Sequence, residues 1–171
     1  KGVPTSFDTR IFALQLGINI AEPDEVDRID ITVDGADVAT KNALLKGGGG
    51  ALLREKVVAY AAKKFIVIID ESKIKSQLEG KMVVEVVPFA HRLVFDSLKK
   101  FTSKISYRSA DEKLGPIITD NGNFLLDCDM LIKDPKKTEV ELNTIPGVVE
   151  NGIFTKFDKI IVGTKEGSRV L

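Results

Sequence analysis

The spacing of apolar residues in the first part of the chain predicts alternating strands and helices. Residues 29–34 alternate between apolar and polar side chains, which indicates a strand ending at Asp34. Residues 51–64 contain no Gly or Pro and have helical composition. Residues 65–70 form a continuous apolar run, which is the pattern of a strand covered by helices on both faces. A strand, a helix and a second strand in this order predict a parallel β-α-β unit.

A different order of elements begins near residue 83. The predicted elements are a strand at 83–87, a helix opened by Pro88, a strand at 104–108, hairpin strands around 120–122, a helix after Pro135 and a strand at 147–153. This β-α-β-β-α-β order is typical of a ferredoxin-like unit. A further buried strand is predicted at 159–163, followed by a turn and a short final strand.

These patterns together predict an α/β fold with two domains. We expect a Rossmann-like core with a parallel sheet, formed by residues 1–80 and 154–171. Residues 81–153 would form a ferredoxin-like α+β domain inserted into that core.

The connection between the first predicted strand and its helix holds the candidate chemistry. Asp34 and Asp37 leave the same strand end, so that two carboxylates lie close together. Lys46 precedes four glycines at 47–50, directly before the predicted helix. Unpaired N–H groups at a helix start favour an anion, and Lys46 adds a full positive charge beside them.

Glu55 lies in the first turns of that helix, among small apolar residues. Its neighbours at helical spacing are Ala51, Leu52, Val58, Ala59 and Ala62. Burial of a carboxylate in such a stripe raises its pKa toward the range that suits a general base at neutral pH. The alternative is a structural ion pair with Arg54, Lys56 or another segment of the chain, because such pairs also perturb pKa values.

Composition excludes several classes of partner. Lys plus Arg and Asp plus Glu number 25 each, so no net charge favours nucleic acid or an anionic membrane surface. No apolar run approaches the length of a membrane span. The single cysteine, Cys128, forms no intramolecular disulfide, which fits a reducing compartment such as the cytoplasm, and its strand-like context favours packing over catalysis. The single histidine, His91, has no partners at ligand spacing, so we expect no metal site.

Five segments, in the same order, resemble the type A ribose-5-phosphate isomerases. They are the Asp-Gly-Ala-Asp of 34–37, the Lys-Gly-Gly-Gly of 46–49 with Arg-Glu-Lys at 54–56, Asp70 with Ser-Lys at 72–73, Thr-Asp-Asn-Gly-Asn at 119–123 and the Asn-Thr-Ile-Pro-Gly-Val-Val-Glu-Asn-Gly of 143–152. Each motif alone is weak evidence. Five in register, across nearly the whole chain, are strong evidence.

The resemblance implies an enzyme that interconverts ribose 5-phosphate and ribulose 5-phosphate in the pentose phosphate pathway. It implies no cofactor, and a homodimer or homotetramer. The predicted catalytic residues are Glu55 as the base, Lys46 with the N–H groups of Gly47, Gly48 and Gly49 for the oxyanion, and Asp34 and Asp37 for sugar hydroxyls and ring opening. Gly35 and Ala36 complete the predicted substrate contacts beside the two aspartates, and Lys73 would contact a phosphate or a hydroxyl.

Two further expectations follow from the resemblance. We predict a first helix from Thr5 or Ser6 to Leu16, followed by a short strand at 18–20. The family has another strand and a phosphate-binding loop ahead of this helix. Neither that strand nor that loop is in this sequence. The alternative function is a sugar-phosphate sensor or an inactive homologue of the same fold, because fold alone does not decide function. A sensor needs anion binding but no buried base.

Overall fold

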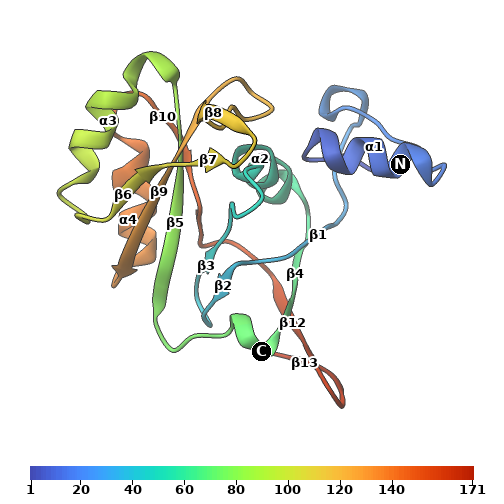
Figure 1. Cartoon of the computed structure of the whole chain (residues 1–171). Coiled ribbons are helices and arrows are strands. Elements are labelled where there is room, and N and C mark those ends of the chain that lie inside the picture. The colour runs from blue at the N-terminus through green and yellow to red at the C-terminus, as the bar shows by residue number, and fades with distance from the viewer.

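The computed structural model describes residues 1–171 and contains two four-stranded sheets (Figure 1). The first has the order β1-β4-β12-β13. Its strands are β1 (Thr32–Asp34), β4 (Phe65–Asp70), β12 (Lys159–Thr164) and β13 (Gly167–Val170). The first three are parallel, and β13 is an antiparallel edge strand. The fold is therefore mixed α/β with a parallel sheet, as the sequence predicts.

The β-α-β unit is present, with shorter elements than expected. The predicted strand at 29–34 is reduced to β1, because Ile29 forms only an isolated bridge with Ala62. The predicted helix at 51–64 is α2 (Leu52–Ala61). It ends there because Ala62 adopts an extended backbone and the N–H of Lys63 donates to the carbonyl of Ile29.

The second sheet has the order β10-β5-β9-β6 and is antiparallel throughout. It consists of β5 (Leu78–Val86), β6 (Ile105–Tyr107), β9 (Phe124–Ile132) and β10 (Val148–Asn151). The helices α3 (His91–Leu98) and α4 (Pro135–Asn143) each follow a long strand of this sheet. The chain order of these six elements agrees with the predicted β-α-β-β-α-β order.

A small third sheet, β11-β3-β2, joins the two parts of the molecule. Its strands are β2 (Val38–Ala39), β3 (Leu44–Leu45) and β11 (Ile153–Phe154). The strand predicted at 147–153 is thus divided at Gly152, whose N–H donates to Val83 in β5 while its carbonyl accepts from Lys46. This division was not predicted, and it joins Lys46 through Gly152 to β5.

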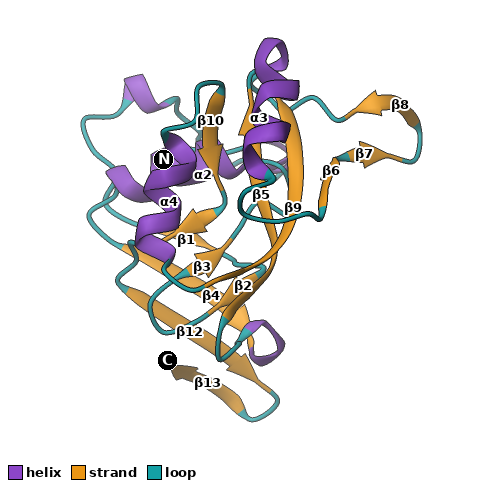
Figure 2. Ribbon diagram, turned by 90° about the vertical axis from the view of Figure 1, so that its left-hand side faces the viewer, coloured by secondary structure: helices purple, strands orange, loops and turns teal.

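The remaining elements lie outside the three sheets. α1 (Phe7–Gln15) is capped by the Ser6 side chain, but the strand predicted at 18–20 makes only a bridge between Gly2 and Ile20. The hairpin of β7 (Ser109–Ala110) and β8 (Lys113–Pro116) extends away from the body (Figure 2). Short 3-10 helices occur at η1 (Pro23–Glu25), η2 (Glu71–Lys73) and η3 (Pro88–Ala90).

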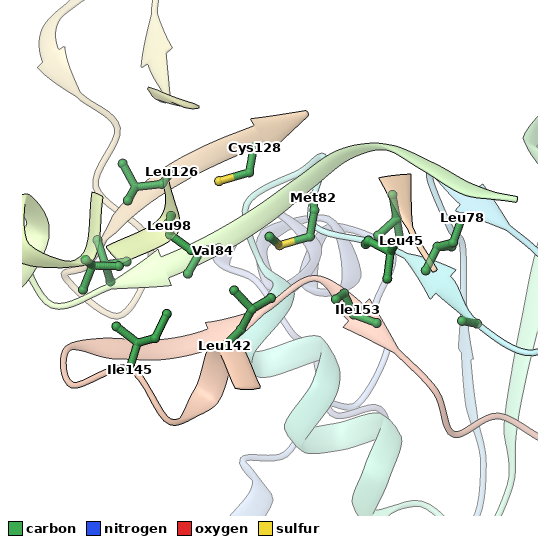
Figure 3. Close-up of a cluster of buried hydrophobic side chains, with 14 residues drawn as sticks. Leu45, Leu78, Met82, Val84, Leu98, Leu126, Cys128, Leu142, Ile145 and Ile153 are labelled. Atoms are coloured by element: carbon green, nitrogen blue, oxygen red, sulfur yellow. The ribbon is translucent and has the colours of Figure 1, made fainter. Parts of the chain in front are cut away.

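Two apolar clusters form the core. One lies between the antiparallel sheet and its helices, where Met82, Leu126 and Cys128 are fully buried (Figure 3). Burial raises the pKa of the Cys128 thiol to about 12, which agrees with a packing role. The other cluster packs α2 on one face of the parallel sheet. The opposite face leaves Val33 and Ile68 about half exposed, so the expected cover on both faces is not found in this chain.

None of the helices combines the length and the apolar character that crossing a bilayer would require.

Candidate active site

Lys46 lies at the centre of the predicted site and is almost completely buried, with 3% of its surface exposed. Its Nζ donates to the carbonyl oxygen of Gly35 at 2.6 Å and forms an ion pair with Oδ2 of Asp34 at 2.9 Å. Its backbone N–H donates to the carbonyl of Gly152. The ammonium group is therefore held at the carboxyl end of β1, beside the two residues that the sequence places there.

Glu55 reaches the same ammonium group from the first turn of α2. Its Oε2 lies 3.4 Å from Lys46 Nζ, and this oxygen is buried without a well-aligned hydrogen bond. Burial raises the pKa of Glu55; the positive charge of Lys46 opposes that shift, and the nearby charges of Asp34 and Asp37 reinforce it. Glu55 is thus buried with a raised pKa, and its ion-pair partner is Lys46, which belongs to another segment of the chain, so this contact fits both the base and the structural ion pair.

The alternative ion pairs of Glu55 with its neighbours on the helix are not found. Arg54 donates from Nε to Asn121 Oδ1 and from Nη2 to the carbonyl of Asp120, both at 2.8 Å. Lys56 pairs with two other carboxylates, which lie on α4 and β10. Adjacent residues on a helix point about 100° apart, so Glu55 faces Lys46 without competition from either.

The glycine turn brings Asp37 into the site. Gly47 has φ of +106°, and the N–H of Gly48 donates to Oδ2 of Asp37 at 2.8 Å. A Cβ at position 48 would lie 2.6 Å from Oδ1 of Asp37, so only glycine allows this approach. The N–H of Gly50 closes the turn on the carbonyl of Gly47. Of the three predicted oxyanion donors, the Gly48 N–H is thus engaged by a carboxylate, while those of Gly47 and Gly49 have no protein acceptor.

Lys73 lies apart from this cluster. It ends η2, where its charge contributes to the lowered pKa of Asp70, mainly caused by the hydrogen bonds from Ser72. Asp34 is opposite Val67 in the parallel ladder, so Asp70 lies three residues further along β4, about 10 Å away. The two strand ends are offset, and no contact joins Lys73 to Lys46 or Glu55. Its role as a phosphate or hydroxyl contact stays a prediction.

Arg108 is a residue that the sequence analysis missed. It follows β6, and its Nη1 donates to the carbonyl oxygens of Gly47 and Gly48 at 2.7 and 3.0 Å. Its Nε and Nη2 hold the buried carboxylate of Asp127. One signal was available, because Asp127 interrupts an apolar strand and a buried carboxylate requires a cation.

The turn at residues 119–123 does more than reverse the chain. It closes with the N–H of Gly122 on the carbonyl of Thr119, but the hairpin predicted around it is not found. Only an isolated bridge between Ile118 and Phe124 flanks the turn, because β9 pairs with β5 and β6. In addition, the side chains of Thr119, Asn121 and Asn123 all donate to Oε1 of the fully buried Glu85. The turn is therefore anchored in the antiparallel sheet and supports Arg54 of α2 through Asn121.

Comparisons with known proteins agree with the resemblance. The sequence matches the family described as ribose 5-phosphate isomerase A (phosphoriboisomerase A) over residues 1–167. It is 49% identical to a ribose-5-phosphate isomerase A of Methanococcus aeolicus, covering 99% of this chain and 74% of the relative. It is 52% identical to that of Thermococcus kodakarensis, covering 97% of this chain and 75% of the relative.

Solved structures give the same result. The structure of ribose 5-phosphate isomerase A from Methanocaldococcus jannaschii superposes with a TM-score of 0.95 at 46% identity, covering 99% of this chain and 77% of that one. A ribose 5-phosphate isomerase from Plasmodium falciparum superposes with a TM-score of 0.90 at 32% identity, covering 99% and 76%. Sequence and fold therefore agree that this chain belongs to the ribose 5-phosphate isomerase A family.

Proposed function

We propose that this chain interconverts D-ribose 5-phosphate and D-ribulose 5-phosphate, with Glu55 as the base. The observation that carries the proposal is the triad of Asp34, Lys46 and Glu55, in which a buried carboxylate with a raised pKa keeps one oxygen free of well-aligned hydrogen bonds. Glu85 also leaves one buried oxygen, Oε2, without a hydrogen bond, so the position of Glu55 beside Lys46 and Asp34 carries the assignment and not the unpaired oxygen alone.

The reaction moves hydrogen within one molecule and is redox-neutral. Ionised Glu55 takes the proton from C2 of the open-chain aldose, and the electron pair of the broken C–H bond forms an enediolate. The protonated Glu55 then returns the proton to C1, while the hydroxyl proton moves from O2 to O1, which gives the ketose. Lys46 lies 3.4 Å from the base and supplies the positive charge that stabilises the developing oxyanion.

The two aspartates hold and open the sugar ring in this proposal. Asp34 and Asp37 both accept hydrogen bonds from backbone N–H groups, so their carboxylates are fixed in place. Gly35 and Ala36 lie between them and line the same turn. Donors not already used by the protein, such as the Gly49 N–H, are available for substrate oxygens. Lys73 is assigned to the distal phosphate or hydroxyl end on the resemblance alone.

A solved relative supports the substrate class. One ribose-5-phosphate isomerase with 46% identity and a TM-score of 0.96 is described in complex with phospho-erythronic acid. This four-carbon phosphorylated acid carries a planar, anionic pair of oxygens, which is the arrangement that an enediolate presents to the protein. A site built for that charge distribution binds such an acid more tightly than the substrate.

We infer finer points of organisation on the same grounds. The antiparallel sheet has the strand order expected of an inserted ferredoxin-like domain at 81–153, beside a Rossmann-like core. Phe89, Leu93 and Leu114 are at least 70% exposed, which favours a homodimer or homotetramer that covers them, and sedimentation velocity measures that state. The free, buried Cys128 and the family's metabolic role support the cytoplasm.

A coupled assay for ribulose 5-phosphate formation tests the proposed function. We expect turnover with ribose 5-phosphate that saturates with substrate and disappears on adding phospho-erythronic acid. Binding of the sugar phosphate without any turnover would instead identify a sensor or an inactive homologue.

A further inference from the structure

The glycine turn beside Lys46 is held from outside the site by one side chain. Arg108 comes from the inserted segment, and a single nitrogen, Nη1, donates to the carbonyl oxygens of both Gly47 and Gly48. The Arg108 side chain is only 12% exposed. Few residues other than arginine can bind two carbonyls and a carboxylate at the same time, because the planar guanidinium presents five donors in a fixed arrangement.

The direction of these two carbonyls determines the direction of two N–H groups. All peptide bonds in the chain are trans, so the carbonyl of Gly47 and the N–H of Gly48 point in opposite directions from the same peptide unit. With the Gly47 carbonyl held by Arg108, the Gly48 N–H points toward Asp37 and donates to it at 2.8 Å. In the same way, the Gly48 carbonyl on Arg108 directs the Gly49 N–H away from the guanidinium, where it meets no protein acceptor.

The turn needs such a support because its own residues restrain it weakly. Four consecutive glycines have the largest backbone freedom of any sequence, and a peptide plane between glycines can rotate at little steric cost. Within the turn, a single backbone hydrogen bond, from Gly50 to Gly47, limits that rotation. Asp127 in turn holds Arg108 through both carboxylate oxygens, and Lys81 lies 3.6 Å from Asp127.

We propose that Arg108, oriented by Asp127, is a positioning residue that sets the peptide planes of the glycine turn, and thereby the N–H groups that fix Asp37 and face the substrate. The expected effect of Arg108 on turnover rests on the proposed function, whereas its expected effect on the glycine turn does not. Arg108 touches no substrate atom in this assignment. It acts through Gly48 and Gly49.

The decisive variants are Arg108→Lys and the double variant Arg108→Met with Asp127→Leu. Lysine keeps the charge but cannot bridge the carboxylate and both carbonyls. The double variant replaces a buried ion pair by apolar side chains of similar size, a change that commonly preserves stability. Arg92→Met is the matched control, because Arg92 is an exposed arginine that pairs only with Asp96 on α3.

Amide hydrogen exchange provides a readout that does not depend on catalysis. In the wild type, the Gly48 N–H is protected by Asp37. We expect its exchange to accelerate at least tenfold in both Arg108 variants, while amides in β5 and β9 and the melting temperature change little. Arg92→Met should leave Gly48 protected. Unchanged Gly48 exchange in a folded Arg108→Lys protein would overturn the proposal, whether or not the wild type isomerises ribose 5-phosphate.

Turnover provides the second readout. Removing a preorganised oxyanion donor outright costs about 10²–10³ in kcat, so a misdirected donor should cost about 10-fold or more, with a smaller change in KM. Affinity for phospho-erythronic acid should fall in parallel with kcat, whereas affinity for ribitol 5-phosphate, which has no planar anionic group, should change less than threefold. Equal losses for both ligands, accompanied by a fall in melting temperature, would assign Arg108 to stability alone. If the wild type is inactive but Gly48 exchange still accelerates in the Arg108 variants, the proposed function is rejected and the positioning role of Arg108 is retained.

Discussion

Two buried lysines both lie beside the ring of Phe154, and each is paired with two carboxylates. Lys46 contacts Asp34 and Glu55, while Lys56 contacts Glu139 and Glu150 at 3.1 and 2.9 Å. Both lysines are less than 5% exposed. The charge composition of the two clusters is the same, yet we propose only the first as the active site.

The difference lies in how the carboxylates are satisfied. Glu139 also accepts hydrogen bonds from Tyr60 and Thr155, and Glu150 from Asn143 and the backbone of Asn151. Glu55, in contrast, has a buried oxygen without a well-aligned donor and a raised pKa, and it faces a turn with open N–H groups. The Lys56 cluster therefore resembles a structural ion-pair network, whereas the arrangement around Glu55 is the one that we propose for catalysis.

The largest expected effect is on turnover when Glu55 is changed to Gln. The amide keeps the volume but removes the basic oxygen, so kcat should fall by about 10²–10⁴-fold while affinity for the sugar phosphate changes little. Glu139→Gln is the matched control in the other cluster, and it should lose stability but keep kcat per folded molecule. Steady-state kinetics with urea unfolding of both variants measures this. Wild-type turnover in Glu55→Gln would return the base to Asp34 or Asp37.

The next effect is on stability when Lys56 is changed to Met. Removal of this cation leaves Glu139 and Glu150 buried beside each other without a counter-charge, and such a loss costs about 3–5 kcal/mol. Activity per folded molecule should survive, because Lys56 pairs with Glu139 and Glu150 and not with Glu55. Lys46→Met should show the reverse pattern, in which most of the activity is lost and stability changes less. Urea unfolding and kinetics on both lysine variants measure the contrast, and an inactive but stable Lys56→Met protein would contradict it.

These two clusters also mark what sequence analysis can and cannot find. Asp34, Lys46 and Glu55 were predicted because they lie within one strand-turn-helix connection, where local geometry alone brings them together. The partners of Lys56 come from 83 and 94 residues further along the chain, and no local pattern predicts such a pair. Arg108 was missed for the same reason, since its glycine partners precede it by 60 residues or more.

The fold follows the same rule. The order of the longer helices and strands was predicted correctly because hydrophobic periodicity reports each element separately, whereas the short strands β2, β3, β7 and β8 were missed. The predicted ends of helices and strands were less accurate where tertiary contacts decide them. At Ala62 the chain leaves α2 and pairs with Ile29. At Gly152 one predicted strand is divided between two sheets. The exposed Ile68 shows that an apolar run predicts a strand whose two faces can both be buried, but it does not identify the elements that would cover them.

The smallest expected effect concerns the pH dependence of stability, and it separates the two clusters without measuring catalysis. The folded state raises the pKa of Glu55 above its ordinary value of 4.5, mainly through burial. The folded protein therefore binds this proton more tightly than the unfolded chain does. The stability that protonated Glu55 contributes is complete below pH 4.5 and is lost as the pH rises through the folded-state pKa.

Glu55→Gln removes this titration, so the variant should gain stability relative to the wild type as the pH rises from 4.5 toward neutrality, and the gain should then level off. The size of this gain measures how far folding raises the pKa of Glu55. Urea unfolding at a series of pH values measures the difference between the two proteins. The acid limb of kcat/KM should have its midpoint in the same pH window, because the same carboxylate must be ionised to act as the base. A stability difference that does not vary with pH would mean that Lys46 compensates the burial of Glu55 completely, and the two clusters would then be electrostatically alike.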